Sequence, residues 1–215
     1  MSLDVAIVDH GLGNLFSVER ACAAVGMEAT ITQDPAVVAE ATAIILPGVG
    51  SFPTAMQRLT DRDLVTPLRE APRRGQYLIG ICLGAQLLLS RSTEQGETAG
   101  LGCIPGSVIH LQELVDDPAV RVPHVGWNTA TPTHGEAVAA PDELAALFDA
   151  PLEMYFVHSY VLETDSAHCL ATTAYAGEQF CAVVAAPYVI GVQFHPERSG
   201  PAGIALYEQI HALIE

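Results

Sequence analysis

The chain has 215 residues, enough for one domain with its own hydrophobic core. It carries 25 acidic residues against nine arginines and contains no lysine, which gives a formal charge of −16. This charge argues against nucleic acid or anionic membranes as partners, because both attract clustered positive charge. Without an apolar run approaching the roughly 18 residues of a membrane span, and without a basic, secretory-type start, the sequence predicts a cytoplasmic protein.

The first half of the chain alternates short apolar runs with amphipathic stretches, which predicts strands followed by helices. The first loop, at 10–14, has the spacing Gly-x-Gly but lacks the third glycine of a dinucleotide fingerprint, so we interpret it as a strand-to-helix turn. Asp34 and Pro35 are typical of the start of a helix. The expected strands are 4–9, 28–31, 43–46 and 77–81, and the expected helices are 15–25, a short one from 35 and one from 51.

A glycine-rich loop, Pro47-Gly48-Val49-Gly50, follows the third expected strand. Two glycines around one valine leave backbone N–H groups unhindered, so the loop is a candidate donor to an oxyanion. An alternative interpretation is a flexible loop that only caps the helix starting at Ser51.

The fourth expected strand runs directly into Gly80-Ile81-Cys82-Leu83-Gly84-Ala85-Gln86. A strand that stops at a small-x-Cys-x-small turn and continues as a helix is typical of a nucleophile elbow, in which the central residue is strained and its side chain rises above the carboxyl end of the sheet. Glycines flank the cysteine because larger side chains would collide there. Taken alone, the pattern is equally compatible with an ordinary tight turn that buries a thiol.

In the second half, strand-like runs with short links predict antiparallel hairpins. The expected elements are a polar loop at 94–99, a strand at 105–110, a turn-flanked segment at 123–128, a helix at 141–148, strands at 154–161, 169–175, 179–186 and 188–194, and a closing helix at 203–214. The whole chain, 1–215, is therefore expected to form one α/β domain: a doubly wound, mostly parallel, flavodoxin-like sheet with an antiparallel extension. Sites in such sheets lie beyond the carboxyl ends of the strands.

The run 189–199 places His195 and Glu197 two residues apart. Residues i and i+2 of an extended chain point to the same side, and Pro196 biases His195 toward extended backbone. A carboxylate beside an imidazole, together with Cys82, provides the three roles of a catalytic triad. The alternative, a surface turn with a salt-linked histidine, is the weaker interpretation next to an elbow cysteine.

The remaining cysteines and histidines show no ligand spacing, so neither a metal site nor a cofactor is expected. Five cysteines are scattered without a Cys-x-x-Cys pair, and apart from Cys82 we interpret them as small apolar fillers rather than as a disulfide framework. His158 ends an apolar strand, where a hydrogen-bonded core histidine is commoner than a catalyst, so we leave it out of the triad.

The motifs at 47–50, 80–86 and 191–197 together resemble those of the class I (triad) glutamine amidotransferases, and the match spans nearly the whole chain. Within that family, the segments at 123–128, 155–160 and 198–199 resemble the glutaminase subunits of imidazole glycerol phosphate synthases. Two positions depart from the pattern: Ala85 stands where methionine is commoner in these subunits, and the loop at 10–14 is only close to the usual one.

This resemblance implies that Cys82 attacks the side-chain amide of glutamine, that His195 shuttles the proton to the leaving ammonia, and that Glu197 orients His195. It further implies an oxyanion hole built from the loop at Val49 and Gly50 and the N–H of Leu83. The loop at Val49 is expected to turn an N–H toward the oxyanion only when a partner is engaged. Substrate contacts are expected from the following residues: Gly48, Gly50, Gln86, Ser159 and Tyr160.

A partner is expected on chemical grounds, because the fold uses essentially all residues and leaves nothing to consume the ammonia. The resemblance identifies it as a (β/α)₈-barrel cyclase subunit, with which the chain would form a heterodimer in histidine biosynthesis. Asn14, Pro123 and Trp127 are the interface candidates, although a half-buried core aromatic is an equal interpretation of Trp127. Two alternatives remain: a triad glutaminase serving a pyridoxal phosphate or aminobenzoate synthase, and a non-catalytic, stress-response binder with a cysteine elbow.

Overall fold

A computed structural model describes residues 4–115, 117, 119–133 and 142–215. The expected helix start at Pro141 and the side chain of His134 lie outside these residues. Within them, no helix is long and apolar enough to cross a membrane.

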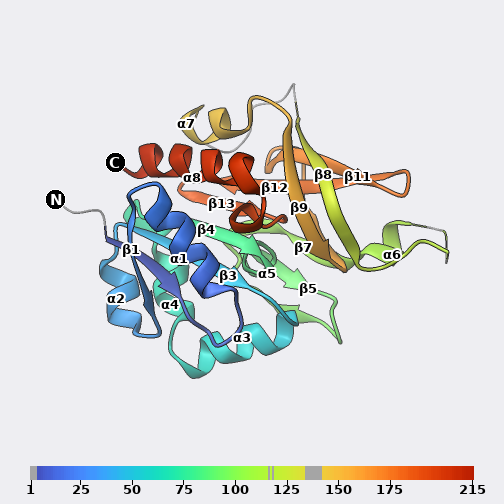
Figure 1. Ribbon diagram of the computed structural model, residues 1–215. Coiled ribbons are helices and arrows are strands. Elements are labelled where there is room, and N and C mark those ends of the chain that lie inside the picture. Colours follow the sequence, from blue (N-terminus) through green and yellow to red (C-terminus); the bar gives the residue numbers. More distant parts are fainter. Residues whose placement is uncertain (1–3, 116, 118, 134–141) are drawn as a thin grey trace.

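The structure alternates strands and helices up to residue 87 and is mainly β from there to residue 192 (Figure 1). The strands are β1 (Asp4–Val8), β2 (Glu28–Thr32), β3 (Ala43–Gly48), β4 (Tyr77–Cys82), β5 (Leu89–Ser92), β6 (Thr98–Ala99), β7 (Ile104–His110), β8 (His124–Pro132), β9 (Leu152–His158), β10 (Tyr160–Glu163), β11 (Cys169–Tyr175), β12 (Glu178–Ala186) and β13 (Val189–Val192). The α-helices are α1 (Leu15–Ala24), α2 (Pro35–Glu40), α3 (Phe52–Asp61), α4 (Val65–Glu70), α5 (Leu83–Leu87), α6 (Leu111–Leu114), α7 (Asp142–Ala145) and α8 (Gly200–Ile214), with 3₁₀ turns η1 (Pro72–Arg74), η2 (Ala146–Phe148) and η3 (Pro196–Arg198).

Five parallel strands form the centre of the sheet in the order β2-β1-β3-β4-β13. This is the flavodoxin-like order of a doubly wound fold. Beyond β13 the sheet continues through β12, β10, β7, β5 and β6, in which most neighbours are antiparallel. The expected parallel sheet with an antiparallel extension is therefore confirmed.

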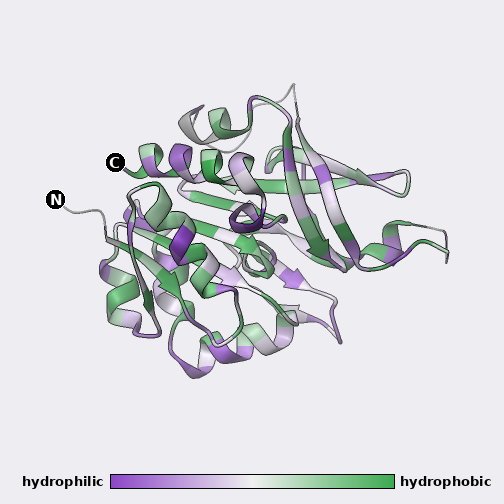
Figure 2. Cartoon of the chain, in the orientation of Figure 1, coloured by the Kyte–Doolittle hydropathy of each residue, from purple (hydrophilic) through white to green (hydrophobic). Residues whose placement is uncertain are grey.

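Alternating residues of the central strands pack against helices on opposite faces of the sheet. Ile7 and Ile45 face α1 and α8, whereas Ala6, Ile44 and Leu46 face α2, α3 and α4. Because both faces are covered, β3, β4 and β13 are buried along almost their whole length, and in Figure 2 the middle of the sheet is mainly hydrophobic between helices whose outer sides are hydrophilic. The Asp34 side chain accepts a hydrogen bond from the N–H of Ala36, which confirms the expected helix start.

The antiparallel part differs from the expected hairpins in one place. The expected strand 154–161 is two strands: β9 ends at His158 and pairs with β8, whereas β10 begins at Tyr160 and pairs with β7 and β12. The break at Ser159 turns the chain toward the cavity described below. The hairpins β11–β12 and β12–β13 are formed as expected.

Three further expectations between residues 83 and 132 were incomplete. The elbow helix α5 is short, and the chain re-enters the sheet as β5 at Leu89. The expected polar loop contains β6 at its end, and the segment at 123–128 belongs to the nine-residue strand β8. A short apolar run such as 87–89 fits a helix or a strand equally well, and only its pairing with β7 decides between them.

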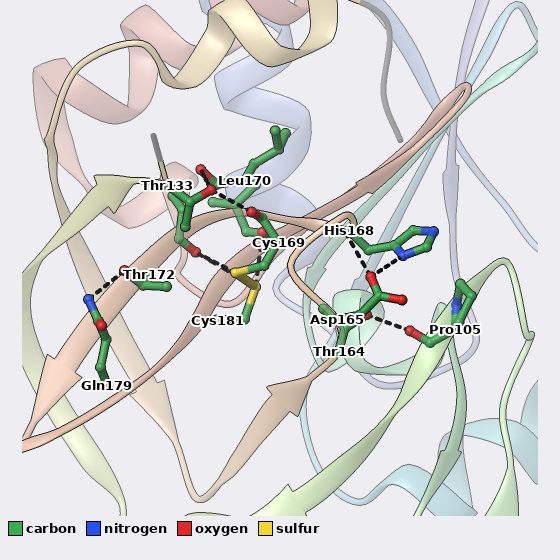
Figure 3. Close-up of a disulfide and its surroundings, with 12 residues drawn as sticks. Pro105, Thr133, Thr164, Asp165, His168, Cys169, Leu170, Thr172, Gln179 and Cys181 are labelled. Atoms are coloured by element: carbon green, nitrogen blue, oxygen red, sulfur yellow. Dashed lines mark hydrogen bonds and ion pairs between the residues drawn. A yellow bond between two sulfur atoms is a disulfide. The ribbon is translucent and has the colours of Figure 1, made fainter. Parts of the chain in front are cut away.

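The interpretation of all cysteines other than Cys82 as apolar fillers was wrong for one pair. Cys169 on β11 and Cys181 on β12 form a disulfide between neighbouring strands (Figure 3). The pairing of β11 with β12 shifts register between Cys169 and Thr172, and the Cα atoms of Cys169 and Cys181 lie 5.9 Å apart. Such a local irregularity cannot be read from the spacing of cysteines along the chain.

Candidate active site

Three parallel strands bring their carboxyl ends together at the site. Gly48 at the end of β3 lies opposite Cys82 at the end of β4, and Ile81 lies opposite Val192 at the end of β13. The chain continues from β13 into His195 within three residues. The strand order thus assembles segments that are separated by more than a hundred residues.

Cys82 has the strained backbone expected of a nucleophile elbow, with φ 55° and ψ −110°, a region that non-glycine residues rarely occupy. Gly84 permits this turn, because a Cβ there would lie 1.7 Å from the carbonyl oxygen of Leu46. At Gly80 a Cβ would lie 2.7 Å from the backbone of Gly84 and Ala85. The glycines are therefore required by the close packing of α5 on β3 and β4.

His195 and Glu197 form a buried hydrogen-bonded pair. His195 has extended backbone, with φ −107° and ψ 91°, and its Nδ1 lies 2.8 Å from Oε1 of Glu197. The Ser199 hydroxyl donates to the carbonyl of His195 at 2.6 Å and accepts from the N–H of Tyr155 at 3.0 Å, which ties this segment to β9. The backbone N–H of His195 also donates to the carbonyl of Tyr155.

The ring nitrogen of His195 opposite Glu197, Nε2, is buried and has no hydrogen-bond partner among the described residues. Burial alone would lower the pKa of His195, but its interactions with Cys82 and Glu197 outweigh that effect and raise the pKa to about 10. Since the hydrogen bond to Glu197 uses Nδ1, Nε2 is the atom that remains for the thiol of Cys82. An imidazolium in this place would be stabilised by the Glu197 carboxylate.

Cys82 and His195 line one cavity of about 310 Å³. The other residues that line the cavity come from the loop after β3, from α5, and from the end of β9 and the start of β10. The loop after β5 and the loop before β8 contribute one residue each. These lining residues are Val49, Gly50, Leu83, Gln86, Glu94, Pro123, Val157, His158, Ser159 and Tyr160. The cavity is thus lined by the loop at 49–50, where the sequence predicts oxyanion donors, and by Gln86 and the segment 159–160, where it predicts substrate contacts.

Gln86 is held in place by two hydrogen bonds. Its Nε2 donates to the carbonyl of Tyr160 at 3.0 Å and to Oε1 of Gln193 at 3.1 Å. Gln193, which is completely buried, in turn directs its Nε2 toward the sulfur of Cys82 at 3.8 Å. Because both bonds of Gln86 use its nitrogen, its Oε1 is the atom available to a ligand in the cavity.

Of the interface candidates, Pro123 lines the cavity, whereas Asn14 and Trp127 lie outside its lining. Trp127 is 58% exposed and packs edge-on against Tyr155, so the alternative of a core aromatic is wrong. Val125, on the same face of β8, is 54% exposed. The outer face of β8 therefore presents two large apolar side chains.

Sequence reasoning missed Glu94, a buried carboxylate in the lining of the cavity. One of its oxygens, Oε2, accepts a hydrogen bond of 2.7 Å from the N–H of Phe52 in the first turn of α3. Glu94 follows β5, which the sequence did not predict, so no sequence signal placed this residue near Cys82. Gln193 was missed as well, although its position two residues before His195 could have suggested a role.

The described residues contain no cluster of three or more histidine, cysteine or acidic side chains arranged to hold a metal ion. The polar groups of the site suit acyl chemistry: a strained thiol, an imidazole with a fixed carboxylate, and a glycine loop.

Comparison with known proteins agrees with this geometry. Residues 6–210 match the family model described as glutamine amidotransferase class-I. The imidazole glycerol phosphate synthase subunit HisH of Salinibacter ruber is 42% identical, covering 96% of this chain and 93% of that protein. The proteins of the same name from Lacticaseibacillus casei (42% identical, 98% and 96% covered) and Carboxydothermus hydrogenoformans (39% identical, 97% and 98% covered) are similarly related.

Solved structures share the fold at low sequence identity. PurLQS from Thermotoga maritima superimposes with a TM-score of 0.72 at 16% identity, over all of both chains. The glutaminase domain of Trypanosoma brucei CTPS with bound acivicin gives a TM-score of 0.67 at 16% identity, over 99% of this chain and 93% of that one. At this identity the similarity concerns the fold alone.

Proposed function

The chain belongs to the class I glutamine amidotransferase family, and we propose that it is the glutaminase subunit of an imidazole glycerol phosphate synthase, hydrolysing glutamine and passing the ammonia to a second subunit. The observation that carries the proposal is the shared cavity of Cys82, on its strained elbow, and the His195–Glu197 pair. The relatives named as synthase subunits, at 39–42% identity over nearly the full chain, support this pathway over the pyridoxal phosphate and aminobenzoate alternatives.

In the first half of the reaction, the sulfur of Cys82 attacks the carboxamide carbon of glutamine, and its proton passes to Nε2 of His195. The hydrogen bond to Glu197 orients the ring and stabilises the imidazolium. His195 then returns the proton to the leaving nitrogen, so that ammonia departs and a glutamyl thioester remains. In the second half, water attacks the thioester while His195 accepts its proton. The bond between carbon and the Cys82 sulfur then breaks, His195 returns the proton to the sulfur, and glutamate is released.

The oxyanion of each tetrahedral intermediate requires donors beside Cys82. The N–H of Leu83, in the first turn of α5, is one, because first-turn N–H groups have no partner within a helix. The second comes from Val49 or Gly50, in the loop that follows β3. One missing donor costs about 3–4 kcal/mol, or two to three powers of ten in rate, so a subunit whose loop is turned away is nearly inactive.

Glu94 receives the α-ammonium group of glutamine. Among the described residues it is the only acidic side chain in the lining of the cavity, and its Oε2 is already fixed by the N–H of Phe52. The Oε1 of Gln86 and the backbone of Gly48, Gly50, Ser159 and Tyr160 hold the remaining polar groups of the amino acid. Because the substrate is neutral at its amide end, these contacts at the other end orient the scissile bond toward Cys82.

The second subunit is a cyclase with a (β/α)₈ barrel, and it docks over the mouth of the cavity. Support comes from exposed apolar side chains: Val49, which lines the cavity, and Val125 and Trp127 on β8, the strand that follows the cavity residue Pro123. Asn14 and Pro123 are also exposed and belong to the same proposed interface. Docking places the ammonia acceptor beside its source, so ammonia does not escape to water.

The proposal is tested by measuring glutamate release from glutamine by the purified chain alone, with the cyclase subunit, and with the cyclase subunit and its nucleotide substrate. We expect low activity alone and an increase of at least a hundredfold in the complex with nucleotide. Cys82→Ala should abolish release. Equal rates with and without the cyclase would refute control of the oxyanion loop by the partner, and wild-type chain without activity in every mixture would refute the glutaminase assignment.

A further inference from the structure

His124 and His158 face each other beside the cavity but have no role in the triad chemistry. They occupy directly opposed positions on the antiparallel strands β8 and β9. Both are buried, and Nδ1 of His124 lies 3.0 Å from Nε2 of His158. At the two ends of this pair, His124 Nε2 lies 3.3 Å from the amide nitrogen of Asn128, and His158 Nδ1 lies 2.9 Å from the carbonyl oxygen of Tyr160.

The groups at the two ends determine the direction of every hydrogen bond between them. The carbonyl of Tyr160 only accepts, so Nδ1 of His158 carries a proton and its Nε2 accepts from Nδ1 of His124. Nε2 of His124 then accepts from Asn128. The amide of Asn128 is oriented independently, because its nitrogen also donates to the carbonyl of Ala174 at 2.8 Å. One arrangement of protons, with both rings neutral, satisfies the whole series.

Aromatic rings surround the pair and keep it neutral. The ring of His124 lies between those of Phe156 and Tyr175, with centroids 5.2 and 4.2 Å away, and Phe180 lies edge-on to His158 at 5.6 Å. Burial lowers the pKa of His124 to about 4 and that of His158 to about 3. At neutral pH neither ring gains the second proton that would place two donors against each other.

The inner end of the series reaches the residues that bind the substrate. The carbonyl of Tyr160 accepts from His158 and also from Gln86, and these three residues line the cavity. Gln86 in turn contacts Gln193, which lies against Cys82. A shift of His158 would therefore move the Tyr160 carbonyl and release Gln86.

We propose that Asn128, His124 and His158 are positioning residues that hold the Tyr160 carbonyl, and through it Gln86, in the geometry that binds the amino acid part of glutamine. The inference rests on the proposed glutaminase function and deepens it, since it assigns a role to groups that do not touch the reacting atoms. It requires an ordered series of donors, which can be broken one bond at a time.

Paired substitutions at each histidine test the order of donors. Asparagine places an N–H near the position of histidine Nδ1, whereas glutamine places its polar group near Nε2. His124→Asn keeps the donor to His158 and His124→Gln removes it. In the same way, His158→Asn keeps the donor to Tyr160 and His158→Gln removes it. The members of each pair are both polar and uncharged, so a general loss of packing affects them alike.

Two readouts separate substrate positioning from damage to the fold. The first is the KM for glutamine in the complex with the cyclase, together with the rate at which a glutamine-like diazoketone labels Cys82. The second is alkylation of Cys82 by iodoacetamide, which needs no amino acid binding. Mass spectrometry of the labelled peptide identifies Cys82, and burial, which raises the pKa of Cys22 to about 12 and that of Cys103 to about 11, disfavours alkylation of these two thiols.

We expect His158→Gln, which removes the donor to Tyr160 itself, to raise KM about tenfold and to slow diazoketone labelling about tenfold, the effect of one lost buried hydrogen bond, with kcat and iodoacetamide alkylation within twofold of wild type. His124→Gln and His158→Asn both break the bond between the two histidines but leave a donor to Tyr160, so both should raise KM by the same smaller factor, about threefold. His124→Asn, which keeps both bonds, should stay within twofold of wild type. The positioning role would be overturned if the asparagine and glutamine variants of each histidine had equal KM values, or if labelling by the diazoketone and alkylation by iodoacetamide slowed equally. Either result would leave the proposed function intact as long as the wild-type complex releases glutamate. Wild-type chain that the diazoketone does not label, even in the complex, would defeat both proposals.

Discussion

The side-chain nitrogen of Gln86 lies 3.1 Å from Oε1 of Gln193, although 107 residues separate them in the chain. The bond joins the short helix after the elbow to the segment that carries His195. Since Gln193 also points its nitrogen at the sulfur of Cys82, one buried amide contacts both the proposed nucleophile and a residue of the proposed substrate site.

Replacing Gln193 should therefore lower catalytic efficiency without loss of the nucleophile. Gln193→Leu keeps the volume but leaves Gln86 with one hydrogen bond fewer, and we expect kcat/KM for glutamine to fall about tenfold. Gln57→Leu, at an exposed position on α3 that is not part of the cavity lining, is the matched control and should have no effect. Unchanged kcat/KM in Gln193→Leu would show that Gln86 is positioned by Tyr160 alone.

The Glu197 carboxylate should control the protonation of His195. Glu197→Gln removes one of the two interactions that raise the pKa of His195, so the value of about 10 should fall, as followed by NMR of the labelled histidine. We also expect kcat to drop roughly 10³- to 10⁴-fold, as for other triads that lose their carboxylate. Glu208→Gln, exposed on α8, is the matched control. A His195 pKa unaffected by Glu197→Gln would contradict this role.

The same pKa shift predicts how the free energy of unfolding depends on pH. A raised pKa in the folded state means that the folded protein binds the His195 proton more tightly than the unfolded chain. This stabilisation is complete below pH 6.5 and disappears as pH rises through about 10. Melting temperatures from pH 6 to 10 should fall more steeply for wild type than for Glu197→Gln. Parallel curves would contradict the shift.

Glu94 should determine the requirement for an α-ammonium group. Glu94→Gln keeps an oxygen for the N–H of Phe52 but removes the charge, and we expect KM for glutamine to rise roughly tenfold to a hundredfold, the effect of one charge-assisted hydrogen bond. The analogue that lacks the amino group, glutaramate, provides the control, because its poor turnover should change little. Equal losses for both substrates would assign Glu94 a structural role instead.

The elbow should not tolerate a side chain at Gly84. In Gly84→Ala the new Cβ would overlap the Leu46 carbonyl, and because that atom is backbone the helix must move, at a cost of about 3 kcal/mol or more. Gly13→Ala, where the nearest atom is 3.4 Å away, is the control and should unfold at the wild-type denaturant concentration. Wild-type stability in Gly84→Ala would mean that β3 and α5 are less closely packed.

The disulfide between Cys169 and Cys181 should be detectable by counting thiols. Protein purified without reductant and then denatured should expose three reactive thiols, those of Cys22, Cys82 and Cys103, and all five cysteines after reduction. Replacing Cys169 and Cys181 together by serine should lower the free energy of unfolding by about 3 kcal/mol, because the bond closes a short loop. Five thiols before reduction would contradict the disulfide.

Much of the chemistry could be predicted from the sequence because it depends on local spacing. The turn around Cys82 requires glycines within two residues of the thiol, and His195 and Glu197 meet because extended backbone repeats every two residues. The alternation of strands and helices similarly predicted the parallel sheet. By contrast, β5, the division between β9 and β10, and the Cys169–Cys181 bond depend on strand pairing across the fold, which no local pattern encodes.

The sequence by itself thus predicted the fold and the three residues that we propose as nucleophile, base and orienting carboxylate. Only the tertiary structure decided what surrounds them: Glu94 in the cavity, Gln193 against Cys82, and the opposed histidines 124 and 158. The physical reason is that each of these groups is polar and buried, so its position is set by the hydrogen-bond partner it must find, and that partner lies on a distant segment of the chain.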